Sequence, residues 1–104
     1  MFLPSILFSR FSYTERFEEQ FKALGPKDQE RVKAFLKDAL SVPLDESKAQ
    51  IERSLDAQKK VIFFAIMPDD PCYMVSFRQE QVLGEYGQIV DVAIFRSLQL
   101  IPDE

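Results

Sequence analysis

The sequence contains no histidine, no tryptophan, one cysteine and three glycines among its 104 residues. The absence of histidine excludes Ser-His-Asp and Cys-His catalytic sites and zinc sites with histidine ligands. Cys72 is alone and has no basic neighbour in the sequence, so it forms no internal disulfide and we expect an ordinary apolar strand residue. A single thiol is typical of a reducing, cytoplasmic compartment. With no glycine-rich phosphate loop either, we expect no cofactor and no metal.

Long hydrophobic runs are missing as well. The apolar residues at the start of the chain have no basic segment before them and no small-residue cleavage site after them, so we do not expect an export signal. No run is long enough to cross a bilayer, and we expect no membrane partner. A length of 104 residues with 46% hydrophobic side chains predicts one globular domain over residues 1–104.

The first half of the chain predicts a strand and a helical hairpin. Residues 6–11 are rich in apolar and aromatic side chains, which favours a strand. Ser12 and Glu15 have the spacing of a capping box, and Gly25 and Pro26 are suited to ending one helix and beginning the next. Apolar residues recur on one face of each helix, and we expect them in the core: Phe17, Phe21, Leu24, Val32, Phe35, Leu36, Ala39 and Leu40.

The second half predicts mainly strands. Residues 44–60 fit a helix by propensity and a strand by a period of two, and both alternatives stay open. Strands are expected over residues 61–67 and 72–77, joined by a proline-rich turn. A polar connector over residues 78–88 leads to a last strand from residue 89 to about residue 95.

This element order predicts an α+β fold: an N-terminal strand, an antiparallel helical hairpin, then a mostly antiparallel β-sheet of three or four strands. The helices can cover one face of such a sheet. Because the strands VIFFAIM and IVDVAIF contain few polar residues, an uncovered face or edge favours a protein partner or a homodimer that forms through an exposed strand.

Three segments resemble RelE/ParE-type toxins, in which a short strand leads into two amphipathic helices and a strand-rich second half. The first is FSRFSYTERFEEQFKALGPKDQERVKAFLKDAL, the second QIERSLDAQKKVIFFAI and the third MVSFRQEQVLGEY. Together they cover about residues 5–86. The resemblance implies a toxin of a toxin–antitoxin pair, acting as a ribosome-associated mRNA endonuclease or on gyrase and neutralised by an antitoxin.

The resemblance also implies site residues for the nuclease. Family positions that carry basic strand residues and a late tyrosine correspond to Arg53, Lys60, Arg78 and Tyr86. In a site without histidine, Arg and Lys can stabilise the charged phosphate, while Tyr or Lys moves the proton. Without the resemblance, the local sequence supports other interpretations. Arg78 beside Glu80 is equally typical of an ion pair at the end of a strand, and Tyr86 is typical of a residue that anchors a loop.

The distribution of charge favours a second hypothesis. Residues 1–60 carry 11 basic and 10 acidic groups, a net charge of +1, whereas residues 61–104 carry 2 basic and 7 acidic groups, a net charge of −5. An acidic sheet would repel RNA. The alternative function is therefore a non-catalytic, acidic protein-interaction module, such as an inhibitor, an immunity-type protein or a subunit of an assembly.

Overall fold

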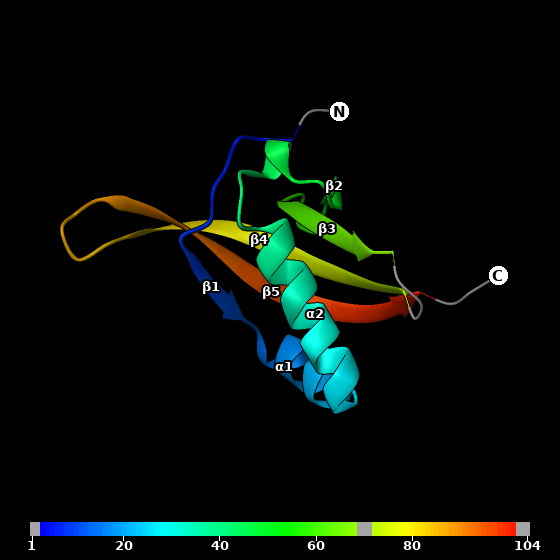
Figure 1. Ribbon diagram of the computed structural model, residues 1–104. Coiled ribbons are helices and arrows are strands. Elements are labelled where there is room, and N and C mark those ends of the chain that lie inside the picture. Colours follow the sequence, from blue (N-terminus) through cyan, green and yellow to red (C-terminus); the bar gives the residue numbers. More distant parts are fainter. Residues whose placement is uncertain (1–2, 69–71, 102–104) are drawn as a thin grey trace.

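The structure is a computed structural model that describes residues 3–68 and 72–101 (Figure 1). The elements follow one another as strand β1 (Arg10–Tyr13), helices α1 (Glu15–Lys22) and α2 (Pro26–Ala39), the 3-10 helix η1 (Leu44–Glu46), and strands β2 (Gln50–Leu55), β3 (Val61–Met67), β4 (Cys72–Leu83) and β5 (Ile89–Ile101). The strands form one five-stranded sheet in the order β1-β5-β4-β3-β2. Strand β1 is parallel to β5, and the other pairs are antiparallel. The predicted α+β fold is confirmed.

The N-terminal strand begins later than the sequence predicts. Strand β1 pairs with β5 from Arg10 opposite Val92, and the predicted strand over residues 6–11 is wrong over most of its length. Residues before β1 pack against the core instead, because Phe8 is buried and the carbonyl of Ile6 accepts the N–H of Leu44 at 3.0 Å. This segment thus joins η1 to the sheet.

The predicted capping box at Ser12 and Glu15 is also wrong. Ser12 lies within β1, opposite Ile94, so its backbone is already extended and paired. Thr14 is the N-cap of α1, and its Oγ1 accepts the N–H of Phe17 at 3.2 Å. Helix α2 begins at Pro26 as predicted.

In the second half, residues 50–55 form strand β2, which decides between the two alternatives for residues 44–60. Strand β3 has its predicted bounds. Residues 69–71 of the predicted turn after β3 lie outside the described part of the chain. The predicted connector over residues 78–88 is wrong up to Leu83, because β4 continues to that residue. Strand β5 continues past residue 95 to Ile101.

The core lies between the helices and one face of the sheet (Figure 1). Val32, Val75 and Phe77 are fully buried there. Phe21, Leu24 and Phe35, expected in the core, are only partly buried. Phe35 stands at the margin of the apolar stripe of α2, and Phe21 lines an open groove. No helix in the described part of the chain is long and apolar enough to span a membrane.

Side-chain alternation defines the two faces of the sheet. Residues such as Phe63 and Phe77, which stand opposite each other, point toward the helices. We call the other side the open face. The register places on it Ile62, Phe64 and Ile66 of β3, Met74, Ser76, Arg78 and Glu80 of β4, Val90, Val92 and Ile94 of β5, and Arg10 and Ser12 of β1.

Candidate functional site

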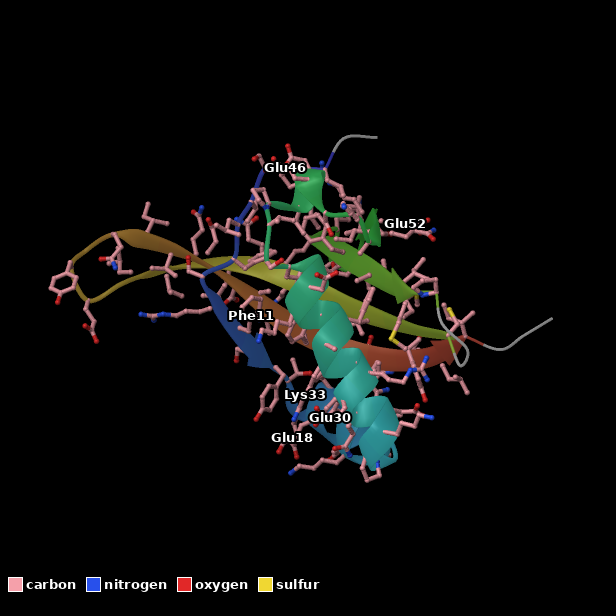
Figure 2. The ribbon with its side chains drawn as sticks, in the orientation of Figure 1. Phe11, Glu18, Glu30, Lys33, Glu46 and Glu52 are labelled. Carbon is pink, nitrogen blue, oxygen red and sulfur yellow. The ribbon has the colours of Figure 1, made fainter. Side chains whose placement is uncertain are left out.

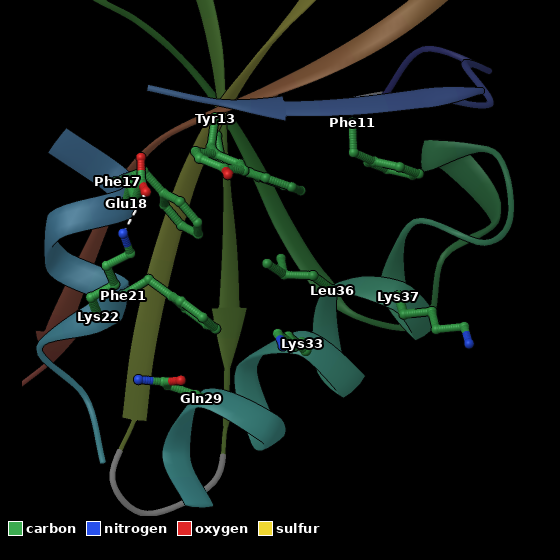
Figure 3. Close-up of a pocket in the computed structure, with 11 residues that line it drawn as sticks. Phe11, Tyr13, Phe17, Glu18, Phe21, Lys22, Gln29, Lys33, Leu36 and Lys37 are labelled. Atoms are coloured by element: carbon green, nitrogen blue, oxygen red, sulfur yellow. Dashed lines mark ion pairs between the residues drawn. The ribbon is translucent and has the colours of Figure 1, made fainter. Parts of the chain in front are cut away.

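A groove of about 630 Å³ opens between β1, α1 and α2 on the helical side of the sheet (Figure 3). We call it the aromatic groove. Its apolar lining is Phe11, Tyr13, Phe17, Phe21, Phe95 and Leu36, and its polar lining is Glu18, Lys22, Gln29, Lys33 and Lys37. Figure 3 shows Tyr13 of β1 beside Phe17 and Phe21 of α1, with Phe11 further along β1 and with Leu36 and Lys33 of α2 opposite the strand.

Short-range sequence patterns direct these side chains into the aromatic groove. Phe11 and Tyr13 alternate with Ser12 on β1 and stand opposite Ala93 and Phe95, so they point to the helical side. Phe17 lies on α1, and its ring is 5.4 Å from that of Phe95. The ring of Phe11 stacks on Phe95 at 6.2 Å, with an angle of 6° between the planes. Phe95 therefore joins β1 and α1 at the floor of the groove.

Two aromatic residues of the groove are unusually exposed for their size. Phe11 and Tyr13 leave 53% and 56% of their surface accessible to solvent. A cluster of exposed apolar side chains bordered by polar ones is typical of an interaction site. The aromatic groove is therefore the strongest candidate binding surface in the described part of the molecule.

The rim of the aromatic groove is cationic although the chain as a whole carries a charge of −4. Three lysines and one glutamate line it, a net charge of +2. Lys22 donates to Glu18 at 2.7 Å, and this hydrogen bond and the carboxylate charge raise the pKa of Lys22. Lys33 lies 5.8 Å from the centre of the Phe21 ring. Figure 2 shows Glu46 and Glu52 far from this rim, at the η1 and β2 end of the molecule.

Of the four residues that the resemblance implies, Arg78 has the most distinctive surroundings. It lies on the open face and forms an ion pair with Glu80 at 3.1 Å, as one of the two interpretations predicts. Its Nε is buried and has no hydrogen-bond partner among the described residues. The backbone N–H of Lys60 donates to Asp56 in the β2–β3 turn at 2.9 Å.

The structure does not bring the four residues together. Arg53 stands opposite Phe63, so it lies on the face of the sheet away from Arg78. Tyr86 lies beyond the end of β4, more than about 17 Å along the strand from Arg78. Tyr86 does not anchor its loop through its ring, which is 91% exposed. Arg53 and Tyr86 therefore do not share a site with Arg78.

A second cavity, of about 420 Å³, lies on the open face. It is lined by Thr14, Arg16, Asp56, Ile62, Phe64, Ser76, Arg96 and Ser97. A β-bulge opposite Ser76 and Phe77 adds one residue to β5, Arg96, whose guanidinium contacts Asp56 at 3.4 Å. The backbone N–H of Lys60, together with that of Gln58 and the charge of Arg96, lowers the pKa of Asp56.

The charge of the open face differs from the charge of the second half of the chain. Of the two acidic residues in β4 and β5, Glu80 lies on the open face, whereas Asp91 stands opposite Gln81 on the helical side. The first half adds Arg10 and Glu52 to the open face by their register, and it adds Arg16 and Asp56 in the second cavity. The net charge of a sequence segment does not indicate the charge of one face of the sheet, because alternate residues of a strand point to opposite faces.

Within residues 3–68 and 72–101, no group of three acidic or cysteine side chains lies close enough to hold a metal ion. In comparisons with known proteins, no family model matches the chain, and neither a curated protein nor a solved structure does so.

Proposed function

We propose that this chain is a RelE/ParE-like toxin-type protein that is bound and controlled by a protein partner. The observation that carries the proposal is the aromatic groove, with its exposed Phe11 and Tyr13 and its rim of lysines. The order of elements, a strand, two helices and then a strand-rich half, agrees with the resemblance to these toxins. The partner takes the role that an antitoxin has in such a pair.

The lining of the aromatic groove indicates the chemistry of the partner segment. An amphipathic helix places apolar residues at positions i, i+3, i+4 and i+7 on one face, which suits an elongated apolar groove. Aromatic side chains such as those of the groove supply much of the affinity in protein interfaces. Lys33 and Lys37 border the groove on α2 and favour acidic residues on the flank of that helix.

The proposal is tested with the product of a small reading frame adjacent to the gene, co-purified with this chain. We expect a complex whose dissociation constant rises by about tenfold in the K33E/K37E double variant, because two exposed charge contacts contribute about 1 kcal/mol or more. K48E is the control, since Lys48 has the same charge and lies outside the groove. Isothermal calorimetry at low salt measures the three affinities.

Equal affinities for the wild type and K33E/K37E would contradict binding in the aromatic groove. If the adjacent product does not bind, or if no adjacent reading frame encodes a small protein, the toxin–antitoxin assignment fails. The far-ultraviolet circular dichroism of each variant checks that the helices are intact.

A second candidate function is action on RNA, which the arginines of the open face favour. Arg78 has a buried Nε without a partner among the described residues, and Arg10 lies on the same face. An arginine that contacts phosphate contributes to the salt dependence of RNA binding. This function would use the open face and leave the aromatic groove to the protein partner.

For this second candidate, we expect R78A to bind single-stranded RNA more weakly and to reduce the slope of log affinity against log salt by about 1. R53A is the matched control, because Arg53 lies on the other face of the sheet. Fluorescence anisotropy gives the affinities, and mRNA cleavage and growth after induced expression report activity. No RNA binding, with growth unaffected and R78A indistinguishable from the wild type, would exclude this candidate.

A further inference from the structure

Strands β4 and β5 extend beyond the rest of the sheet as a two-stranded hairpin. Strand β3 pairs with β4 no further than Phe77, and β1 pairs with β5 only from Val92 onward. We call residues 79–91 the arm. In Figure 1 the arm projects away from the two helices. Apart from the N–H of Ser9, which donates to the carbonyl of Asp91 at 3.0 Å, each strand of the arm has only the other as a neighbour among the described residues.

Hydrogen bonds give the tip of the arm a defined shape. The N–H of Gly84 donates to the carbonyl of Gln88 at 2.7 Å, and the N–H of Tyr86 donates to the Gln88 side chain at 3.0 Å. Gly87 has a φ of 78°, which glycine adopts without strain. The amide of Gln79 donates to Asp91 across the strands at 2.8 Å. These bonds define the backbone of the hairpin and of its turn.

The tip of the arm is apolar and carries one acidic residue, Glu85. Leu83, Tyr86 and Ile89 are 74%, 91% and 66% exposed. Leu83 and Ile89 stand opposite each other on the same face. Of the three acidic residues in the arm, Glu85 lies at the tip, whereas at the base Glu80 pairs with Arg78 at 3.1 Å and Asp91 accepts from Gln79. An isolated hairpin with so much exposed apolar surface gains stability from a partner.

We propose that the tip of the arm binds in the aromatic groove of a second copy of this chain. The tip of the arm projects from the sheet, is apolar and carries the negative charge of Glu85, whereas the groove is aromatic and bordered by lysines. The chain therefore carries both halves of a complementary contact. Its own arm does not fill its own groove, because the arm projects away from α2 (Figure 1).

This proposal rests on the proposed function, because it assumes that the aromatic groove binds protein. It adds that a partner segment and the arm of a second copy compete for the same place. The contact is heterologous, since different surfaces of the two copies meet, so the wild type forms a ring or a growing chain. Partner binding would then dissociate these assemblies.

The test mixes two variants that are each defective on one side of the contact. The arm variant is L83S/Y86S, and the groove variant is K33E/K37E; K48E is the control. We expect the mass of the wild type and of K48E to increase with protein concentration in analytical ultracentrifugation. Each defective variant should associate at least about tenfold more weakly alone. An equimolar mixture should form dimers and nothing larger, because only one competent contact remains.

Three results would overturn the proposal: a wild type that stays monomeric at about 1 mM, an arm variant that associates like the wild type, or a mixture that stays monomeric. Binding of the adjacent gene product is measured separately with L83S/Y86S. If that variant binds the product and still self-associates, only the arm proposal fails. If it no longer self-associates and the product does not bind the wild type, the arm proposal stands and the proposed function fails.

Discussion

Replacing Phe77 by alanine lowers the free energy of unfolding by about 3–5 kcal/mol. The side chain is fully buried at the point where three parts of the chain meet. Its ring lies 5.4 Å from Phe63 of β3, 5.9 Å from Phe8 of the N-terminal segment and 6.2 Å from Phe95 of β5. The substitution removes buried apolar area and all three ring contacts, and the close-packed surroundings relax only in part.

Urea unfolding followed by circular dichroism measures this change, with equal m-values for variant and wild type. F35A is the matched control, because the same atoms are removed from a residue that is only partly buried. We expect a smaller loss for F35A. A loss below about 1 kcal/mol for F77A, or equal losses for both variants, would contradict the placement of Phe77 at the centre of the core.

The elements that the sequence predicts well are those with a strong local period. Helix α2 repeats Val32, Leu36 and Ala39 on one face, and Pro26 begins it. Strand β3 is a compact apolar run between polar residues, and its bounds agree with the prediction. In these elements the information lies within a few neighbouring residues, so no knowledge of the rest of the fold is needed.

The errors in the fold occur where the deciding partner is distant in the sequence. The N-terminal strand ends at residue 13, and the N–H of Thr14 donates to the carbonyl of Phe95 at 2.9 Å. Nothing near Thr14 in the sequence indicates that partner. Gln79 and Gln81 likewise resemble a polar connector, but both donate to Asp91 across the hairpin. Polar pairs across two strands cannot be recognised in either strand alone.

The candidate site follows the same logic. The spacing of Phe17 and Phe21 places both on one face of α1, and Phe11 and Tyr13 share a face of β1. Their convergence depends on the parallel pairing of β1 with β5, which the sequence does not reveal. The resemblance assigns site residues by their positions along the sequence. Whether they form a site depends on which face of the sheet each side chain occupies. That is why Arg53 and Tyr86 lie apart from Arg78.

Replacing Phe17 by alanine weakens both the fold and the aromatic groove. Phe17 is buried, and its ring lies 6.3 Å from Tyr13, 6.0 Å from Phe21 and 5.4 Å from Phe95. We expect the free energy of unfolding to fall by about 3–4 kcal/mol. The loss of this floor also removes support from Tyr13 and Phe21, so affinity for a protein in the groove should fall by about 30-fold or more.

Leu44→Ala separates these two effects. Leu44 is buried at η1, outside the groove lining, and its truncation should destabilise the fold by about 2–5 kcal/mol. If partner affinity is measured at a temperature where both variants are folded, L44A should bind like the wild type and F17A should not. Equal weakening in both variants would mean that binding follows global stability. Unchanged binding in F17A would place the partner elsewhere on the molecule, because a ligand in the aromatic groove cannot be indifferent to the loss of its floor.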